Sequence, residues 1–285
     1  MSSYSSSIAI NSKNFLQGST NKFICNFPSP VKFQKGDTLT IQECSIYNQF
    51  FNITALNGNN TFSIKWNANS ITQYNFTIPD SYLDVPDINA YIKQQCILNK
   101  LYMIETATGQ YISFIELKTN PSRYATEFYM IPLPTSSQAA SLGYTIPAGA
   151  TWSYPVSSST PQIIITTGFG KLIGFEAATY PSATQQTNYE VISQITPEIV
   201  IITNILIGCN LVNNPYSIPS NIVTAFPIAS AFGSLLTYLN ANASYCSIHD
   251  GFYHQIVIDF YDQDHKPLVI RDKNINLLLN IKKQL

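Results

Sequence analysis

Charged residues are scarce in this sequence. Of its 285 residues, 15 are Lys or Arg and 16 are Asp or Glu, together 11%, against about 25% in an average soluble domain. The densest basic cluster is Lys282-Lys283 at the tail, so direct binding to nucleic acid is not expected. A surface short of charge lacks the repulsion that keeps monomers apart, which favours burial against neighbouring subunits. Coding bias in an AT-rich genome explains the same composition equally well, and the two explanations are compatible.

Long apolar runs and paired cysteines are missing too. The longest nearly apolar runs, Ile199–Gly208 and Ile228–Leu239, are too short and too interrupted to cross a bilayer, so we predict no membrane insertion. The opening residues MSSYSSSIAI do not have the pattern of a signal peptide. The odd cysteine count and the lack of a CxxC motif favour buried, reduced thiols of an intracellular protein over a disulfide framework. The five are Cys25, Cys44, Cys96, Cys209 and Cys246.

Alternating apolar and polar residues run through most of the chain. Near the C-terminus, Ile256, Ile258 and Phe260 share one face of a predicted strand, and after a polar turn the segment 275–281 alternates again. Turn signals recur about every ten residues, which predicts an all-β, antiparallel β-sandwich of single jelly-roll type. The other predicted strands include 23–27 (stopped by Pro28-Ser29-Pro30), 38–47, 61–66, 74–78, 111–118, 127–131, 161–166, 197–209 and 222–226.

The sequence predicts one short helix within this β-rich pattern. Asp84 is a suitable N-cap, Pro86 suits the first turn, and apolar residues recur at helical spacing as far as Leu98. The segment Ala229–Leu239 resembles a helix but contains Gly233, and its assignment stays open. We predict an N-terminal arm at 1–20, a jelly-roll core formed by 21–100 and 194–285, and strands plus an inserted outer region at 101–193.

The best candidates for chemistry gather near the C-terminus, where all three histidines lie. Metal binding requires three or four ligands to converge, yet His249 and His254 would point to opposite faces of an unbroken strand, and 262–266 has the composition of a hairpin tip. A Cys246–His254 nucleophile pair lacks an identifiable oxyanion hole. We therefore predict no catalytic residue, cofactor or metal site, and leave open whether His249, His254 and His265 bind a metal. The full set is Cys246, His249, Asp250, His254, Asp262, Asp264 and His265.

Two further motifs permit a functional interpretation. Gly168-Phe169-Gly170-Lys171 faintly resembles a phosphate loop, but it lacks the GxxxxGK[ST] spacing, so we predict a turn between strands. Trp66, Trp152 and surface tyrosines could stack on sugar rings, as aromatic faces do in lectins.

The order of several short segments resembles that of the minor capsid, or penton, proteins of virophages and Polinton-like viruses. The resemblance covers both ends of the chain and is poor over 119–161. The matching segments are Phe27-Pro28-Ser29-Pro30-Val31, Leu39-Thr40-Ile41-Gln42-Glu43, Ser45-Ile46-Tyr47-Asn48, Phe51-Asn52-Ile53, Ile78-Pro79-Asp80-Ser81-Tyr82, Asp87-Ile88-Asn89-Ala90-Tyr91-Ile92, Lys171-Leu172-Ile173-Gly174-Phe175, Cys209-Asn210-Leu211-Val212 and Asp262-Gln263-Asp264 to Pro267-Leu268.

This resemblance implies a structural virion protein without enzymatic activity. It implies a single jelly roll that forms homopentamers at the fivefold vertices of an icosahedral capsid and contacts the surrounding trimers of the major capsid protein, with assembly in the host-cell cytoplasm. Major capsid proteins of this lineage carry two jelly rolls, for which 285 residues are too few. The alternatives are a carbohydrate-binding β-sandwich, such as a lectin-like attachment module, and a cupin-like metalloenzyme suggested only by the three histidines.

Overall fold

The computed structural model describes residues 3–241 and 244–284, and the chain divides into two compact units. Unit 1 comprises Met1–Phe50 and Ile202–Leu285, and unit 2 comprises Phe51–Ile201. Each unit has its own cluster of buried apolar side chains. Unit 2 is therefore an insertion with a separate hydrophobic core.

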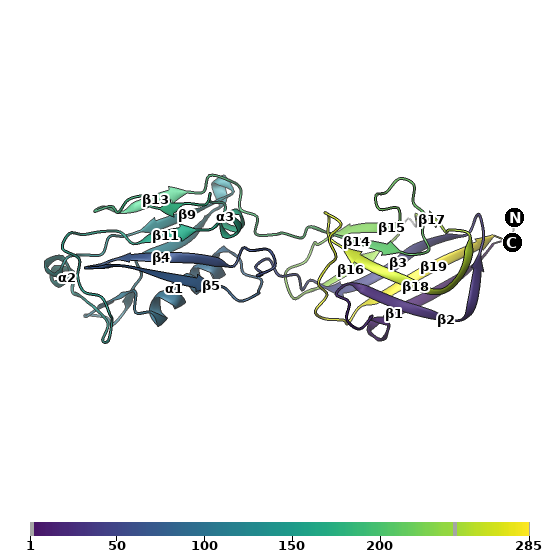
Figure 1. Cartoon of the computed structure of the whole chain (residues 1–285), viewed down its shortest axis with the longest axis horizontal. Coiled ribbons are helices and arrows are strands. Elements are labelled where there is room, and N and C mark those ends of the chain that lie inside the picture. Colours follow the sequence, from purple (N-terminus) through teal and green to yellow (C-terminus); the bar gives the residue numbers. More distant parts are fainter. Residues whose placement is uncertain (1–2, 242–243, 285) are drawn as a thin grey trace. The chain divides into compact units, whose positions relative to one another are not determined.

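Unit 1 is an antiparallel β-sandwich (Figure 1). Its two sheets have the strand orders β1-β19-β3-β16 and β15-β14-β18-β2, and the short strand β17 pairs with β3 outside this path. If these eight long strands (four per sheet) are numbered in chain order, the sheets read 1-8-3-6 and 5-4-7-2, which is the order of a jelly roll. The bounds are β1 Ser3–Asn11, β2 Lys22–Phe33, β3 Thr38–Tyr47, β14 Asn204–Cys209, β15 Ile222–Pro227, β16 Leu235–Leu239, β17 Cys246–Ser247, β18 Gly251–Tyr261 and β19 Asn276–Gln284.

The predicted jelly-roll class is thus confirmed, including the inward faces of its strands. Ile256, Ile258 and Phe260 of β18 are fully buried in the core of unit 1. Unit 2 is inserted between the third and fourth long strands, where β3 ends at Tyr47. The register pairs the start of β3 (Thr38) with Lys282, close to the C-terminus, so the insertion leaves the sandwich at the end opposite to the chain termini.

Unit 2 contains three sheets, with the orders β12-β11-β4-β5, β13-β9-β8 and β10-β6-β7, together with all three α-helices of the described chain. Helix α1 begins as predicted, because Asp84 accepts from the backbone of Asp87 and Asp87 reciprocates in a capping box. Its buried side chains, such as Ile88 and Ile92, join the core of unit 2. The bounds are β4 Thr61–Asn67, β5 Ile71–Thr77, α1 Val85–Leu98, β6 Met103–Glu105, β7 Tyr111–Ile112, β8 Ile115–Asn120, β9 Ala125–Met130, α2 Ser136–Leu142, β10 Tyr144–Thr145, β11 Gln162–Ile165, α3 Thr167–Ile173, β12 Thr179–Tyr180 and β13 Tyr189–Ile192, with a 3-10 turn at Pro121–Arg123; a second 3-10 turn, Ser12–Asn14, belongs to unit 1.

The domain boundaries in the structure differ from those predicted. The segment 51–100 lies in unit 2 and not in the jelly roll, because β4 pairs with β5 and β11 and buries Phe62, Ile64 and Trp66 in the core of unit 2. The predicted arm at 1–20 contains β1, which pairs along its whole length with β19; Met1 and Ser2 lie outside the described residues. This Ser-rich strand is held by backbone pairing and by the inward Ile8 and Ile10.

Several local predictions are corrected as well. Strand β2 continues through Pro28 and Pro30, since it is an edge strand whose register with β18 shifts at this point. The segment Ala229–Leu239, whose assignment the sequence leaves open, forms a turn followed by β16. The predicted strand 197–209 is a strand only from Asn204. The insertion adds the short helices α2 and α3 to the one helix that was expected.

Candidate assembly surface

The structure does not bring the C-terminal candidates for metal binding together. Strand β18 separates His249 and Asp250 from the turn that holds His265, and eleven residues at about 3.3 Å each span more than 30 Å. Among the residues that the structure describes, no group of three or more His, Cys, Asp or Glu could hold a metal ion.

The presence of Asp262 and Asp264 at this place is explained by the turn in which they lie. Asp262 Oδ1 accepts hydrogen bonds from the backbone N–H of Asp264 (2.9 Å) and of Lys266 (2.8 Å), so this carboxylate serves as the internal acceptor of a hairpin turn. Cys246 lies on β17 and is separated from the exposed His254. Burial raises the pKa of the Cys246 thiol, which opposes formation of the thiolate that a nucleophile pair requires.

The other two candidate motifs lie in unit 2. Gly168–Lys171 is part of α3 and not a turn between strands; Thr166 caps this helix, and a Cβ at Gly168 would lie 2.2 Å from the Gly58 carbonyl oxygen. Trp66 is only 1% exposed and packs edge to face against the buried Trp152, with 5.3 Å between ring centroids. Neither tryptophan is available to stack on a sugar.

The five cysteines are free and fit the prediction of reduced thiols. Cys44, Cys96 and Cys209 are buried, whereas Cys25 and Cys246 are partly exposed. Burial raises the pKa of each of the three buried thiols to about 12.

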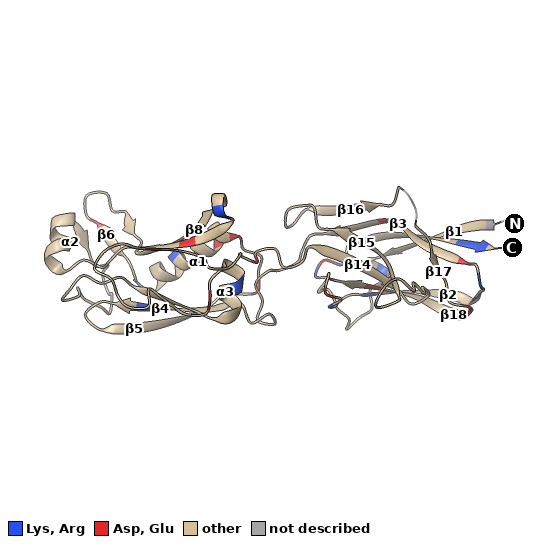
Figure 2. Ribbon diagram, turned by 90° about the horizontal axis from the view of Figure 1, so that it is seen from above, with Lys and Arg blue, Asp and Glu red and all other residues tan. Residues whose placement is uncertain are grey.

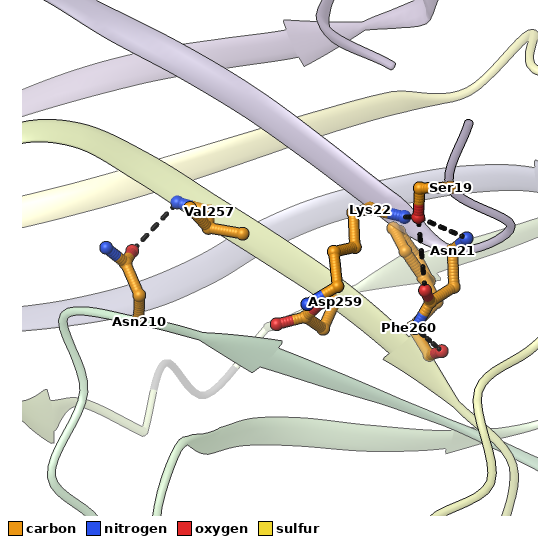
Figure 3. Close-up of polar contacts among 7 residues, drawn as sticks. All are labelled: Ser19, Asn21, Lys22, Asn210, Val257, Asp259 and Phe260. Atoms are coloured by element: carbon orange, nitrogen blue, oxygen red, sulfur yellow. Dashed lines mark hydrogen bonds and ion pairs between the residues drawn. The ribbon is translucent and has the colours of Figure 1, made fainter. Parts of the chain in front are cut away.

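The outward face of the β15-β14-β18-β2 sheet carries a neutralised ion pair (Figure 3). Asp259 is only 6% exposed, and its Oδ1 lies 3.0 Å from Lys22 Nζ on the neighbouring strand. The hydrogen bond and the charge of Asp259 raise the pKa of Lys22. On the other side of Asp259 lies Gly208, where a Cβ would stand 2.9 Å from Asn221 Nδ2 and 3.2 Å from the Tyr261 ring. The missing side chain therefore makes room for Asn221 and Tyr261 to cover this face.

Around the Lys22–Asp259 pair, further polar side chains form hydrogen bonds with the backbone. Ser19 Oγ accepts from the Lys22 N–H, Asn21 Nδ2 donates to the Phe260 carbonyl, and Asn210 Oδ1 accepts from the Val257 N–H at 2.8 Å (Figure 3). Side-chain amides and a hydroxyl, and not charged groups, therefore satisfy these backbone groups.

The outward face of the β1-β19-β3-β16 sheet is almost free of charge, and we call it the neutral face. The register sets outward side chains in rows across the four strands, and strands such as β16 show no charged position in Figure 2. Leu239 and Leu235 of β16 are 67% and 49% exposed. The charged side chains of this face are Glu43 and, near the C-terminal end of β19, Lys282, which alternates with the buried Ile281. The rows that contain Glu43 and the exposed residues of β16 are Leu239–Glu43–Leu278–Ala9, Thr237–Ser45–Asn276–Asn11 and Leu235–Tyr47.

Three of the four edge strands of the sandwich also lack charge. These are β1, β15 and β16; β15 ends at Pro227, and β2 carries both the prolines and the lysines that usually discourage pairing with another chain. Exposed leucines, small neutral neighbours and uncharged edges are what an interface between subunits presents before assembly. Nothing in the sequence pattern alone placed these residues on one face, because the face depends on the register of four distant strands.

No helix in the described part of the chain has the length and apolar character needed to cross a membrane.

Comparison with known proteins gives structural neighbours only. No family model matches the sequence, and no curated protein matches it either. The solved structures similar to this chain include the mavirus penton protein (TM-score 0.46, 11% identity, covering 99% of both chains). They also include a chain of the Sputnik virophage structure obtained by cryo-EM (TM-score 0.43, 11% identity, covering 99% of this chain and 97% of that one).

Proposed function

We propose that this chain is a structural minor capsid protein, a penton, that forms homopentamers at the fivefold vertices of an icosahedral virophage-type capsid. The observation that carries the proposal is a single jelly roll in which one outward sheet face carries only Glu43 and Lys282 as charged side chains and three edge strands carry none. The ordered sequence resemblance to penton proteins supports the same function. The protein acts by burying surface in assembly, and it has no catalytic role.

The symmetry of the proposed ring explains why two different faces are involved. In a closed fivefold ring, each subunit contacts its neighbour through a heterologous interface, so one side of the wedge meets the other side of the next copy. The neutral face supplies one side, and the face containing the neutralised Lys22–Asp259 pair supplies the other. Obligate contacts of this type bury roughly 2,000 Å² or more and are poor in charge.

The remaining partners follow from the same proposal. The ring contacts the surrounding trimers of the major capsid protein through its base, and unit 2 forms the outer region of the vertex. The protein resides in the virion and assembles in the host-cell cytoplasm. It does not bind nucleic acid directly and does not insert into a membrane.

Co-expression with the major capsid protein of the same virus tests the proposal. We expect icosahedral particles in which a cryo-EM reconstruction places five copies of this chain at each vertex. Omission of this chain should give particles with open vertices or no closed particles. Complete, closed particles formed without it, or its density at any site other than the vertices, would contradict the proposal.

A further inference from the structure

Unit 2 contains a pocket that the assembly function does not use. It lies on the outward side of the β13-β9-β8 sheet, beside α1, and has a volume of about 270 Å³. The opposite side of the sheet faces the core, where Leu117 and Phe128 are buried. The alternating partners Glu116 and Tyr129, which pair directly across the strands, therefore face the pocket.

One wall of the pocket is a fixed array of charged groups. The Glu116 carboxylate holds Lys93 Nζ of α1 at 2.9 Å and Lys118 Nζ of its own strand at 3.0 Å. Partial burial alone would raise the pKa of Glu116, but the hydrogen bonds and charges of the two lysines hold it below the ordinary value. The carboxylate stays ionised, and its remaining lone pairs and the free ammonium protons present hydrogen-bonding groups in a defined geometry.

The other wall is aromatic and rigid. The ring of Tyr111 is 56% exposed and is supported from behind by Tyr102, with 4.5 Å between ring centroids. The hydroxyl of Tyr129 accepts a hydrogen bond from Asn188 Nδ2 at 2.8 Å, and Lys118 Nζ lies 4.9 Å from its ring centroid. A half-exposed flat ring beside ordered hydrogen-bonding groups matches a ligand with an apolar face and a rim of hydroxyl groups.

We propose that this pocket binds a neutral sugar ring, stacked on Tyr111 and hydrogen-bonded through its hydroxyl groups to Lys93 and Glu116. The volume of about 270 Å³ lies just below the usual range for ligand sites, roughly 300–1,000 Å³, which limits the occupant to a single ring. Glu127 and Glu190 share this sheet face, so three carboxylates oppose two lysines and an anionic sugar is disfavoured. Sugar binding here does not depend on the proposed assembly at a capsid vertex.

A glycan array followed by titration tests this inference on the full-length chain. The protein is first applied to printed neutral, sialylated and sulfated glycans, and the methyl glycoside of the best neutral ligand is then titrated by saturation-transfer NMR. Tyr111→Ala and Glu116→Gln should each weaken binding by at least about tenfold, because the first removes the stacking surface and the second removes the negative charge that holds Lys93 and Lys118 in place. Tyr111→Phe, which keeps the ring, should retain binding.

Tyr216→Ala is the matched control, because Tyr216 is an exposed tyrosine of unit 1 that lies outside the pocket. Its affinity should equal that of the unmodified protein. The inference is overturned if no neutral glycan binds at millimolar concentration. It is also overturned if only acidic glycans bind, or if folded Tyr111→Ala keeps full affinity. The native mass of each sample, measured in parallel, reports on assembly separately from sugar binding.

Discussion

At the scale of single residues, the pair of Lys22 and Asp259 shows how unit 1 tolerates a carboxylate on a covered sheet face. Asp259 is almost fully buried, whereas the Lys22 side chain is 45% exposed and supplies the compensating charge from an edge strand. A buried carboxylate without its partner is costly, because the desolvation of the ion is then not offset.

Replacement of Lys22 by methionine should therefore destabilise the protein. We expect Lys22→Met to lower the free energy of unfolding by about 1–2 kcal/mol at pH 8, less than for a fully buried pair because Lys22 is partly solvated. The additional change Asp259→Asn should recover much of this loss. Urea unfolding followed by circular dichroism measures the difference, and equal stability of Lys22→Met and the unmodified protein would contradict the account.

The pH dependence of this difference has a definite sign. The pKa of Lys22 is raised in the folded protein from its ordinary value of 10.5. A raised lysine pKa contributes stability that is fully present below pH 10.5 and is lost as the pH rises through the folded value. The difference in free energy of unfolding between the unmodified protein and Lys22→Met should stay constant between pH 7 and pH 9 and should become smaller above pH 10.5. A gap that widens in alkali would exclude this pair as its cause.

The cysteines give a second prediction at this scale. Because burial raises the pKa of Cys44, Cys96 and Cys209 to about 12, iodoacetamide at pH 8 should leave these three thiols unmodified in the folded protein. The partly exposed Cys25 and Cys246 should react, Cys246 more slowly because burial raises the pKa of its thiol, and all five should react in urea. Peptide mass spectrometry identifies the labelled positions. Rapid labelling of Cys209 in the native protein would contradict the burial described here.

At the scale of the elements, the neutral face is the feature with the clearest consequence. A lysine at position 235, opposite Tyr47, points outward from β16 and is tolerated by the fold, but in an interface it would bury a charge without a carboxylate partner across the strands. We expect Leu235→Lys to leave the circular dichroism spectrum unchanged and to weaken assembly by at least about tenfold, as measured by sedimentation velocity over a concentration series.

Leu56→Lys is the control for this experiment. Leu56 is an exposed leucine of unit 2, outside the neutral face, so the added charge should not alter assembly. If both variants assemble like the unmodified protein, the neutral face is not part of the interface.

The sequence predicts individual elements better than their partners. The bounds of β3 match the prediction at both ends because a polar turn precedes an alternating strand, and α1 follows from the capping box at Asp84. Alternation is a local property, however, and β4 alternates in the same way whether it pairs with β11 or with a jelly-roll strand. The sequence does not predict strand β1, because its composition is rich in serine and only two of its side chains, Ile8 and Ile10, are apolar and point into the core. The neutral face was beyond prediction, since it requires the register.

At the scale of the whole molecule, the insertion has the properties of an autonomous domain. It has its own core, and its two ends are joined within unit 2, since Asn52 Nδ2 donates to the carbonyl of Ile199 at 3.0 Å. We expect residues 51–201, expressed alone, to fold cooperatively with Cys96 protected from iodoacetamide. A chain in which a short Gly-Ser linker replaces 51–201 should keep the jelly roll. Failure of both parts to fold would show that the two cores depend on each other.

The native mass of the full-length chain tests the central claim most directly. One chain has a mass of 31.7 kDa, so five chains amount to about 159 kDa (5 × 31.7). We expect light scattering on a sizing column at low ionic strength to give this mass for the chain alone. If the chain alone does not assemble, the same five-chain species should form once the major capsid protein is added. A monomer or a trimer under both conditions would contradict the proposal that this jelly roll forms a fivefold vertex.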